Sequence, residues 1–264
     1  MSTMTTNQGN LAKTMLNKVP EVTIYFWIIK VLCTTVGETA ADFLNINLGL
    51  GLTVTTVVMS VFLAVALAFQ FRLRQYVPGI YWLAVVLISI VGTLITDNLV
   101  DNLRVPLLTT TIVFSVALAA TFAVWYASER TLSIHSIVTT RREAFYWLAI
   151  LFTFALGTAA GDLAAEGLAL GYLTSAVIFG AIIGLVAFAH FGLKVNAVLT
   201  FWIAYILTRP LGASFGDYLI QPHNAGGLAL GLMFTSAIFL VTILALVVYL
   251  SVTRRDRIET AEHA

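Results

Sequence analysis

Residues 27–42 read WIIKVLCTTVGETAAD, and the pattern of this segment occurs four times in the chain. In each copy a tryptophan is followed after nine residues by a glycine, and then after three residues by a small residue and an aspartate. The other copies are WLAVVLISIVGTLITD at 82–97, WLAILFTFALGTAAGD at 147–162 and WIAYILTRPLGASFGD at 202–217. The copies begin 55, 65 and 55 residues apart, so the chain is also two related halves offset by 120 residues. The sequence therefore predicts four repeats of one structural unit.

The composition places these repeats in a membrane. Of 264 residues, 59% are hydrophobic and 10% are charged, with a mean hydropathy of +0.95, which is far from the range of soluble domains. Two apolar segments of spanning length fall in each repeat. The eight segments are 22–41, 50–71, 79–99, 105–127, 144–165, 169–191, 195–219 and 227–250. We therefore predict an all-α membrane protein with eight transmembrane helices arranged as four tandem helical hairpins, in two pseudo-symmetric halves.

The distribution of lysine and arginine predicts the orientation. Most of these residues lie at the two ends of the chain or between repeats, and such segments face the cytoplasm in multi-pass proteins. Both termini are then cytoplasmic, and the first span is expected to act as its own insertion signal because no cleavable signal pattern precedes it. The expected organisation is a cytoplasmic tail at 1–20, a first half at 21–128, a cytoplasmic linker at 129–142, a second half at 143–250 and a cytoplasmic tail at 251–264.

Carboxylates are the most informative polar groups in these apolar segments. An acid within a span costs about 3 kcal/mol on insertion scales, so a repeated one needs a partner, a ligand or water. The motif aspartates are Asp42, Asp97, Asp162 and Asp217, and in three copies a second acid stands four positions away on the same helix face, as Glu38, Asp101 and Glu166. Three interpretations stay open: an ion site, structural hydrogen bonding between repeats, and solvated helix ends.

Two further positions recur in all four repeats, one occupied by a glycine and the other by a hydroxyl residue. The motif glycines, with a small residue four positions later, favour close helix packing, although they would also permit a helix to unwind and offer carbonyls to an ion. These glycines are Gly37, Gly92, Gly157 and Gly212. Hydroxyl residues early in the returning helices would bond within or between helices, or serve as oxygen ligands. They are Thr55, Thr110, Ser175 and Thr235. The motif tryptophans are interpreted as a belt at the membrane interface.

Two cationic side chains break the repeat symmetry. Lys30 and Arg209 each stand where the other copies have uncharged residues. A cation inside a span needs a partner, so each is predicted to act as a counter-ion to an acid or as a gating group. For Arg209 the expected partner is Asp217 or an aspartate of a neighbouring repeat.

The segment Gly37-Glu38-Thr39-Ala40-Ala41-Asp42, with its weaker copies at Gly92, Gly157 and Gly212, resembles a family of bacterial integral membrane proteins. Members of that family are built from four copies of a two-helix repeat of unknown function. The resemblance covers nearly all of residues 20–250. It implies an eight-helix protein of the bacterial cytoplasmic membrane and brings no substrate.

Carboxylates together with hydroxyls and carbonyls suit hard cations such as Mg²⁺, Ca²⁺ or Mn²⁺. We therefore expect a secondary transporter of a Mn-like cation, working as an exporter or with proton coupling, whose ion ligands come from the acids and hydroxyls above and whose metal ligands are the four motif aspartates. A non-transporting scaffold or sensor is the main alternative, and an intramembrane aspartyl hydrolase is a weaker one. Because the two stronger interpretations are not enzymatic, the chain is not expected to be an enzyme. No covalent cofactor is expected beyond a bound Mn²⁺ or Mg²⁺. The expected partners are the bilayer and a small cation, without nucleic acid, and a homo-oligomer stays open.

Overall fold

A computed structural model describes residues 17–256 and contains eight long helices in that part of the chain. All eight are long and apolar enough to cross a membrane, as predicted. A helix satisfies its own backbone hydrogen bonds, which lipid cannot do. The first helices of the four repeats are α2 (Ile24–Asp42), α4 (Pro78–Asp97), α6 (Thr140–Asp162) and α8 (Ala197–Ile220). The second helices are α3 (Leu52–Arg72), α5 (Leu107–Glu129), α7 (Tyr172–Phe191) and α9 (Leu232–Thr253).

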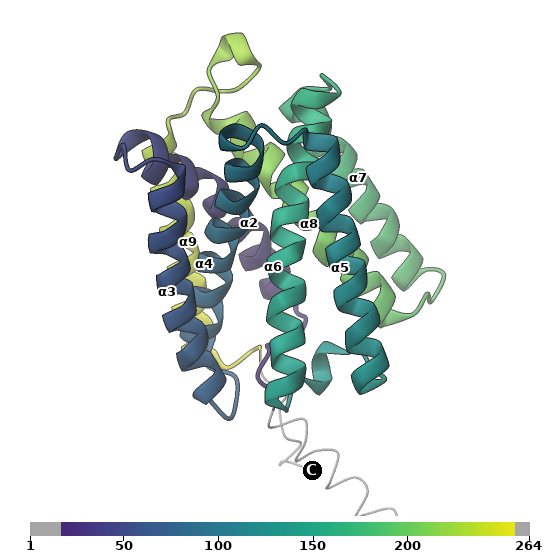
Figure 1. Cartoon of the computed structure of the whole chain (residues 1–264). Coiled ribbons are helices and arrows are strands. Elements are labelled where there is room, and N and C mark those ends of the chain that lie inside the picture. The colour runs from purple at the N-terminus through teal and green to yellow at the C-terminus, as the bar shows by residue number, and fades with distance from the viewer. Residues whose placement is uncertain (1–16, 257–264) are drawn as a thin grey trace, which may run out of the picture.

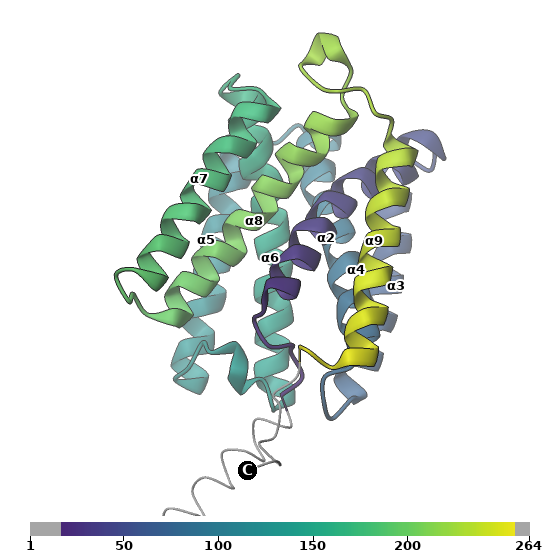
Figure 2. The ribbon, with the colours of Figure 1, turned by 180° about the vertical axis from the view of Figure 1, so that it is seen from behind.

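The helices form two concentric sets (Figures 1 and 2). The first helices make an inner ring in the order α2, α4, α6, α8, and α8 packs back against α2. Each second helix packs mainly against the inner helix of the following repeat, so that α3 lies on α4, α5 on α6 and α7 on α8, while α9 returns to α2. The outer helices expose most of their side chains and shield the inner ring from lipid.

The motif glycines show how closely the inner helices approach. A Cβ atom added at any of the four glycines would collide with a residue of the next inner helix, always the residue three positions before that helix's own glycine. The four contacts are Gly37 with Ser89, Gly92 with Phe154, Gly157 with Arg209 and Gly212 with Thr34. The last contact joins repeat 4 to repeat 1. The repeats therefore form a closed ring with approximate four-fold symmetry.

Aromatic residues make a second set of contacts around the same ring. The aromatic residue before each motif tryptophan lies against the tryptophan of the next repeat. The ring centroids are 5.7 Å apart for Phe26 and Trp82, 5.5 Å for Tyr81 and Trp147, 6.2 Å for Tyr146 and Trp202, and 5.7 Å for Phe201 and Trp27. Trp82, Trp147 and Trp202 are only 2%, 3% and 4% exposed, so the interpretation of a belt at the lipid interface is wrong for these three. They are buried because neighbouring repeats pack on them.

The two ends of the bundle differ. The described chain begins and finishes at one end, called here the termini end, and the turns within the repeats lie at the other, called the turn end (Figures 1 and 2). At the termini end the buried segment 17–20 crosses beneath the helices. Lys18 Nζ lies 2.6 Å from Glu143 Oε2, and Gln70 Nε2 donates to Glu143 Oε1 at 3.1 Å. These contacts tie the segment 17–20 to α3 and α6 at the termini end.

Candidate functional site: a ring of polar layers

Five positions of each inner helix, spaced four residues apart, form layers across the ring. A spacing of four keeps side chains on one face of a helix. From the termini end the aromatic layer is Phe26, Tyr81, Tyr146 and Phe201, and the lysine layer is Lys30, Val85, Ile150 and Tyr205. Then come the arginine layer of Thr34, Ser89, Phe154 and Arg209, the glutamate layer of Glu38, Thr93, Thr158 and Ala213, and the aspartate layer of Asp42, Asp97, Asp162 and Asp217. Residues of the lysine, arginine and glutamate layers are between 0% and 7% exposed.

Arg209 joins all four inner helices. Its Nη2 lies 2.7 Å from Glu38 Oε2, and its Nη1 donates to the Thr34 carbonyl oxygen at 3.2 Å. The same Nη2 donates to the hydroxyl oxygens of Thr93 and Thr158. A planar guanidinium with five N–H donors is suited to contact several acceptors at once. Arg209 therefore links the four inner helices two layers below the aspartates.

The partner of Arg209 differs from the one we predicted. The sequence favoured Asp217 or another motif aspartate, whereas the ion pair is made with Glu38 of repeat 1. On α8 the glutamate layer is occupied by Ala213, and Asp217 lies in the next layer toward the turn end. Asp217 interacts with Arg209 only as a nearby charge. Glu38 is reached because Gly212 lets α8 approach α2 closely.

Thr93 and Thr158 were missing from the predicted site. They occupy the position that Glu38 holds in repeat 1, immediately after the motif glycine. In the sequence, this position stands out because only repeat 1 has an acid there. Once the four repeats are placed in a ring, equivalent positions lie at the same level. Glu38, Thr93 and Thr158 then lie together and accept hydrogen bonds from Arg209.

Lys30 has a different environment from the one we predicted. Its side chain is fully buried, and Nζ lies 4.2 Å from the ring centroid of Phe154 and 4.3 Å from that of Tyr205. Among residues 17–256, no side chain or carbonyl accepts a hydrogen bond from this Nζ. The interpretation that Lys30 neutralises an acid is therefore wrong for this structure. Two aromatic faces supply the contacts that a carboxylate would have made.

The aspartate layer lies at the turn end, above Arg209. Asp42, Asp97 and Asp162 are partly exposed and Asp217 is 9% exposed. Asp97 and Asp217 each interact electrostatically with Glu38, Asp162 and Asp42. Within the described part of the chain, no donor makes a hydrogen bond to the four carboxylates.

The backbone changes directly after three of these aspartates. Asp42, Asp97 and Asp162 end their α-helices, and a π-helical turn follows each: η1 (Phe43–Asn47), η2 (Asn98–Asn102) and η4 (Leu163–Gly167). π-helical turns are rare and occur often at functional sites. Asp101 and Glu166 belong to these turns and are exposed, with Tyr172 donating to Glu166 at 2.9 Å.

In three repeats the hydroxyl side chain near the start of the outer helix donates a hydrogen bond to a nearby backbone carbonyl. Thr55, Thr110 and Thr235 donate to the carbonyl oxygens of Gly51, Pro106 and Gly231, four residues earlier, at 2.8, 3.2 and 2.9 Å. Ser175 Oγ is buried and, among the described residues, has no hydrogen-bond partner. Over residues 17–256, no three His, Cys, Asp or Glu side chains lie close enough to hold a metal ion together.

The comparisons with known proteins agree with the four-repeat architecture. A family model for a Repeat of Unknown Function (DUF347) matches residues 25–76, 80–131, 145–195 and 200–256. No curated protein and no solved structure matches the chain.

Proposed function

Because the chain belongs to the family of the DUF347 repeat, whose function is unknown, we propose a function from the ring itself: secondary transport of a hard divalent cation such as Mn²⁺. One observation carries this proposal. The buried Arg209–Glu38 pair joins the last inner helix to the first, in a ring of membrane-length helices whose turn end holds four carboxylates without hydrogen-bond donors among residues 17–256. Carboxylate oxygens are the ligands that hard divalent cations prefer.

The geometry supports a sequence of binding steps. A cation reaching the turn end meets the aspartate layer first, where mutually repelling charges favour a positive ligand. Glu38 lies one layer deeper and can join the cation only when it leaves Arg209. Arg209 then keeps its bonds to the hydroxyls of Thr93 and Thr158 and to the Thr34 carbonyl oxygen. The guanidinium acts in this scheme as a tethered counter-ion that holds Glu38 while no cation is present.

Protons offer a natural coupling ion for the same site. When the cation leaves, the four aspartates and Glu38 again repel one another electrostatically. A proton on one or more of these carboxylates relieves that repulsion, so protons and the cation compete for the site. We propose export or exchange on this basis, with the direction set by the ion gradients.

The test uses purified protein in liposomes and radioactive ⁵⁴Mn²⁺. In Glu38→Gln/Arg209→Gln the pair is replaced by neutral polar groups, which avoids leaving one buried charge alone. We expect uptake to fall at least tenfold in this variant and in Asp97→Asn/Asp162→Asn. The matched control is Glu129→Gln/Arg142→Gln, which removes a 2.8 Å ion pair at the termini end and should transport normally.

Equal uptake in all three variants would refute a cation path through the ring. A folded wild-type protein that moves neither Mn²⁺ nor Mg²⁺ under any gradient would favour the alternative of a non-transporting scaffold or sensor with structural acids.

We also propose that the protein lies in a bacterial cytoplasmic membrane with its termini end in the cytoplasm. The excess of basic residues at that end supports this orientation. Cysteines introduced at Asn45 and Glu166, in a chain whose native Cys33 is buried, should react with an impermeant thiol reagent only from outside the cell. Labelling of these cysteines from the cytoplasmic side would contradict this orientation.

A further inference from the structure

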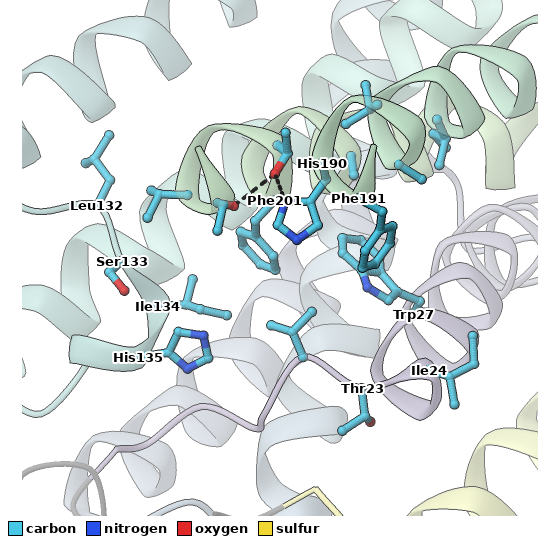
Figure 3. Close-up of a pocket in the computed structure, with 18 residues that line it drawn as sticks. Thr23, Ile24, Trp27, Leu132, Ser133, Ile134, His135, His190, Phe191 and Phe201 are labelled. Atoms are coloured by element: carbon cyan, nitrogen blue, oxygen red, sulfur yellow. Dashed lines mark hydrogen bonds between the residues drawn. The ribbon is translucent and has the colours of Figure 1, made fainter. Parts of the chain in front are cut away.

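A cavity of about 580 Å³ opens between α2, α7 and α8 at the termini end (Figure 3). Its walls are apolar and come from the first turns of α2 and α8 and the last turns of α7. Figure 3 shows Ser133 and His135 of the linker on one side and His190 and Phe191 of α7 on the other. The helices that line it are long and apolar enough to cross a membrane.

The linker makes this cavity different from the rest of the ring. Repeats 2 and 3 are 65 residues apart rather than 55, and the additional chain lies between α5 and α6. Within it, the Leu132 carbonyl oxygen accepts a 2.9 Å hydrogen bond from Trp202 Nε1, and the Ile134 side chain is buried. The linker is therefore fixed against α8, where its residues 132–135 complete the wall of the cavity.

The cavity also exposes the contact between the first and last repeats. Trp27 of α2 and Phe201 of α8 both line it, and their ring centroids are 5.7 Å apart. Trp27 is only partly buried, whereas the other three motif tryptophans are almost completely covered by protein. The set of motif tryptophans is thus least covered by protein at the boundary of α2 and α8.

Polar and basic groups lie on the two connections whose neighbouring residues line the cavity. His135 Nδ1 lies 3.3 Å from Glu21 Oε1, and this contact raises the pKa of His135. The exposed Arg130 precedes the lining residue Leu132 by two positions, and the exposed Lys194 lies on the connection between α7 and α8, both of which line the cavity. An occupant with an apolar chain and an anionic head would match both the walls and the mouth.

We propose that this cavity is a binding site for an anionic phospholipid, with an acyl chain against Trp27, Val186 and Phe201 and the headgroup near His135, Arg130 and Lys194. The bilayer supplies such molecules at the level of the cavity, and basic residues near a membrane surface attract anionic headgroups. The bound lipid would brace α2 against α8, the same two helices that Arg209 and Glu38 join. The inference does not depend on transport.

The experiment measures lipid binding by native mass spectrometry and by thermal melting in detergent. Phosphatidylglycerol and phosphatidylcholine with identical acyl chains are titrated against the wild type, Ala187→Trp and Leu185→Trp. Ala187 lines the cavity, and Leu185, two residues earlier on α7, is 67% exposed and does not line it. We expect phosphatidylglycerol to bind at least tenfold more tightly than phosphatidylcholine and to raise the melting temperature of the wild type and Leu185→Trp, with both effects lost in Ala187→Trp.

Two further measurements complete the test. Arg130→Gln/Lys194→Gln should reduce the preference for phosphatidylglycerol while leaving the binding of phosphatidylcholine unchanged. Glycerol phosphate, which carries the headgroup charge without acyl chains, should not stabilise the protein. Equal binding of the two lipids, an unchanged effect in Ala187→Trp, or full stabilisation by glycerol phosphate would each overturn the proposal.

Discussion

Arg209 of α8 donates a 2.7 Å hydrogen bond to Glu38 of α2, although 171 residues separate them in the chain. Both side chains are buried, Arg209 completely. The ion pair joins the last repeat to the first, at the boundary where the ring of inner helices closes. A buried pair of this kind is costly to break from one side only, because the remaining charge stays in the protein interior without compensation.

Single neutralisation of this pair should therefore destabilise more than double neutralisation. Arg209→Gln and Glu38→Gln should each lower the free energy of unfolding by about 3 kcal/mol, which corresponds to roughly 6–12 °C in melting temperature for a chain of this size. The double variant should recover at least half of that loss. Melting of the purified proteins in detergent gives the coupling energy, and strictly additive losses would mean that the two side chains do not act as a pair.

Helix contact at the motif glycines predicts a second effect on stability. Gly157→Ala adds a Cβ atom onto the side chain of Arg209, and Gly92→Ala places one 2.7 Å from the Phe154 Cβ atom. Overpacking of this kind costs about 1–3 kcal/mol. Gly184→Ala on α7 is the control, because nothing lies within 4 Å of its added Cβ atom. A control that melts as early as the ring variants would argue against close packing as the cause.

The two buried lysines should respond in opposite ways to replacement by methionine. Lys18 is paired with Glu143 at 2.6 Å, so Lys18→Met leaves a buried carboxylate with only the neutral Gln70 amide as a donor among the described residues and should lower the melting temperature. Lys30 has only aromatic contacts among the described residues, so Lys30→Met removes an uncompensated amine and should raise it by several degrees. Thermal melting of both variants in one detergent decides the matter, and a destabilised Lys30→Met would show that the aromatic contacts more than offset the burial of the amine.

The His135–Glu21 contact predicts a pH dependence. The hydrogen bond to Glu21 raises the pKa of His135 above its ordinary value, so protonated His135 stabilises the folded state. This contribution is fully present below the unfolded pKa of about 6.5 and disappears as the pH rises through the higher folded value. The melting temperature of the wild type should exceed that of His135→Gln at pH 5.5 and equal it at pH 9. Glu21→Gln should show the same pH profile as His135→Gln, and a constant difference across this range would refute the assignment.

Much of the fold follows directly from the repeated segment. The tryptophan, glycine and aspartate spacing predicts four units, and the hydropathy predicts two spans in each. The closure of the ring was harder to foresee, because the sequence does not state which repeat lies next to which. Gly212 meeting Thr34 is the contact that decides it, and that contact is visible only in three dimensions.

The site was predicted in part. The column of aspartates was recognised, and Arg209 was identified as the cation that needs a partner. Glu38 as that partner depends on the level at which α8 crosses α2, and the π-helical turns after Asp42, Asp97 and Asp162 depend on backbone geometry that residue types do not reveal. Nothing in the sequence indicated that Asp256, in the segment predicted to be a cytoplasmic tail, is 1% exposed and accepts a 2.6 Å hydrogen bond from Tyr76.

The return of α9 to α2 has a consequence for the synthesis of the protein. The first inner helix enters the membrane with Glu38 already in place, while Arg209 is translated 171 residues later, roughly 9 to 34 s at ordinary elongation rates. During that interval the carboxylate has no guanidinium beside it, and the surface of α2 that α8 and α9 will cover is open to lipid. The first helix therefore enters the membrane before the chain has made the residues that cover it in the folded ring.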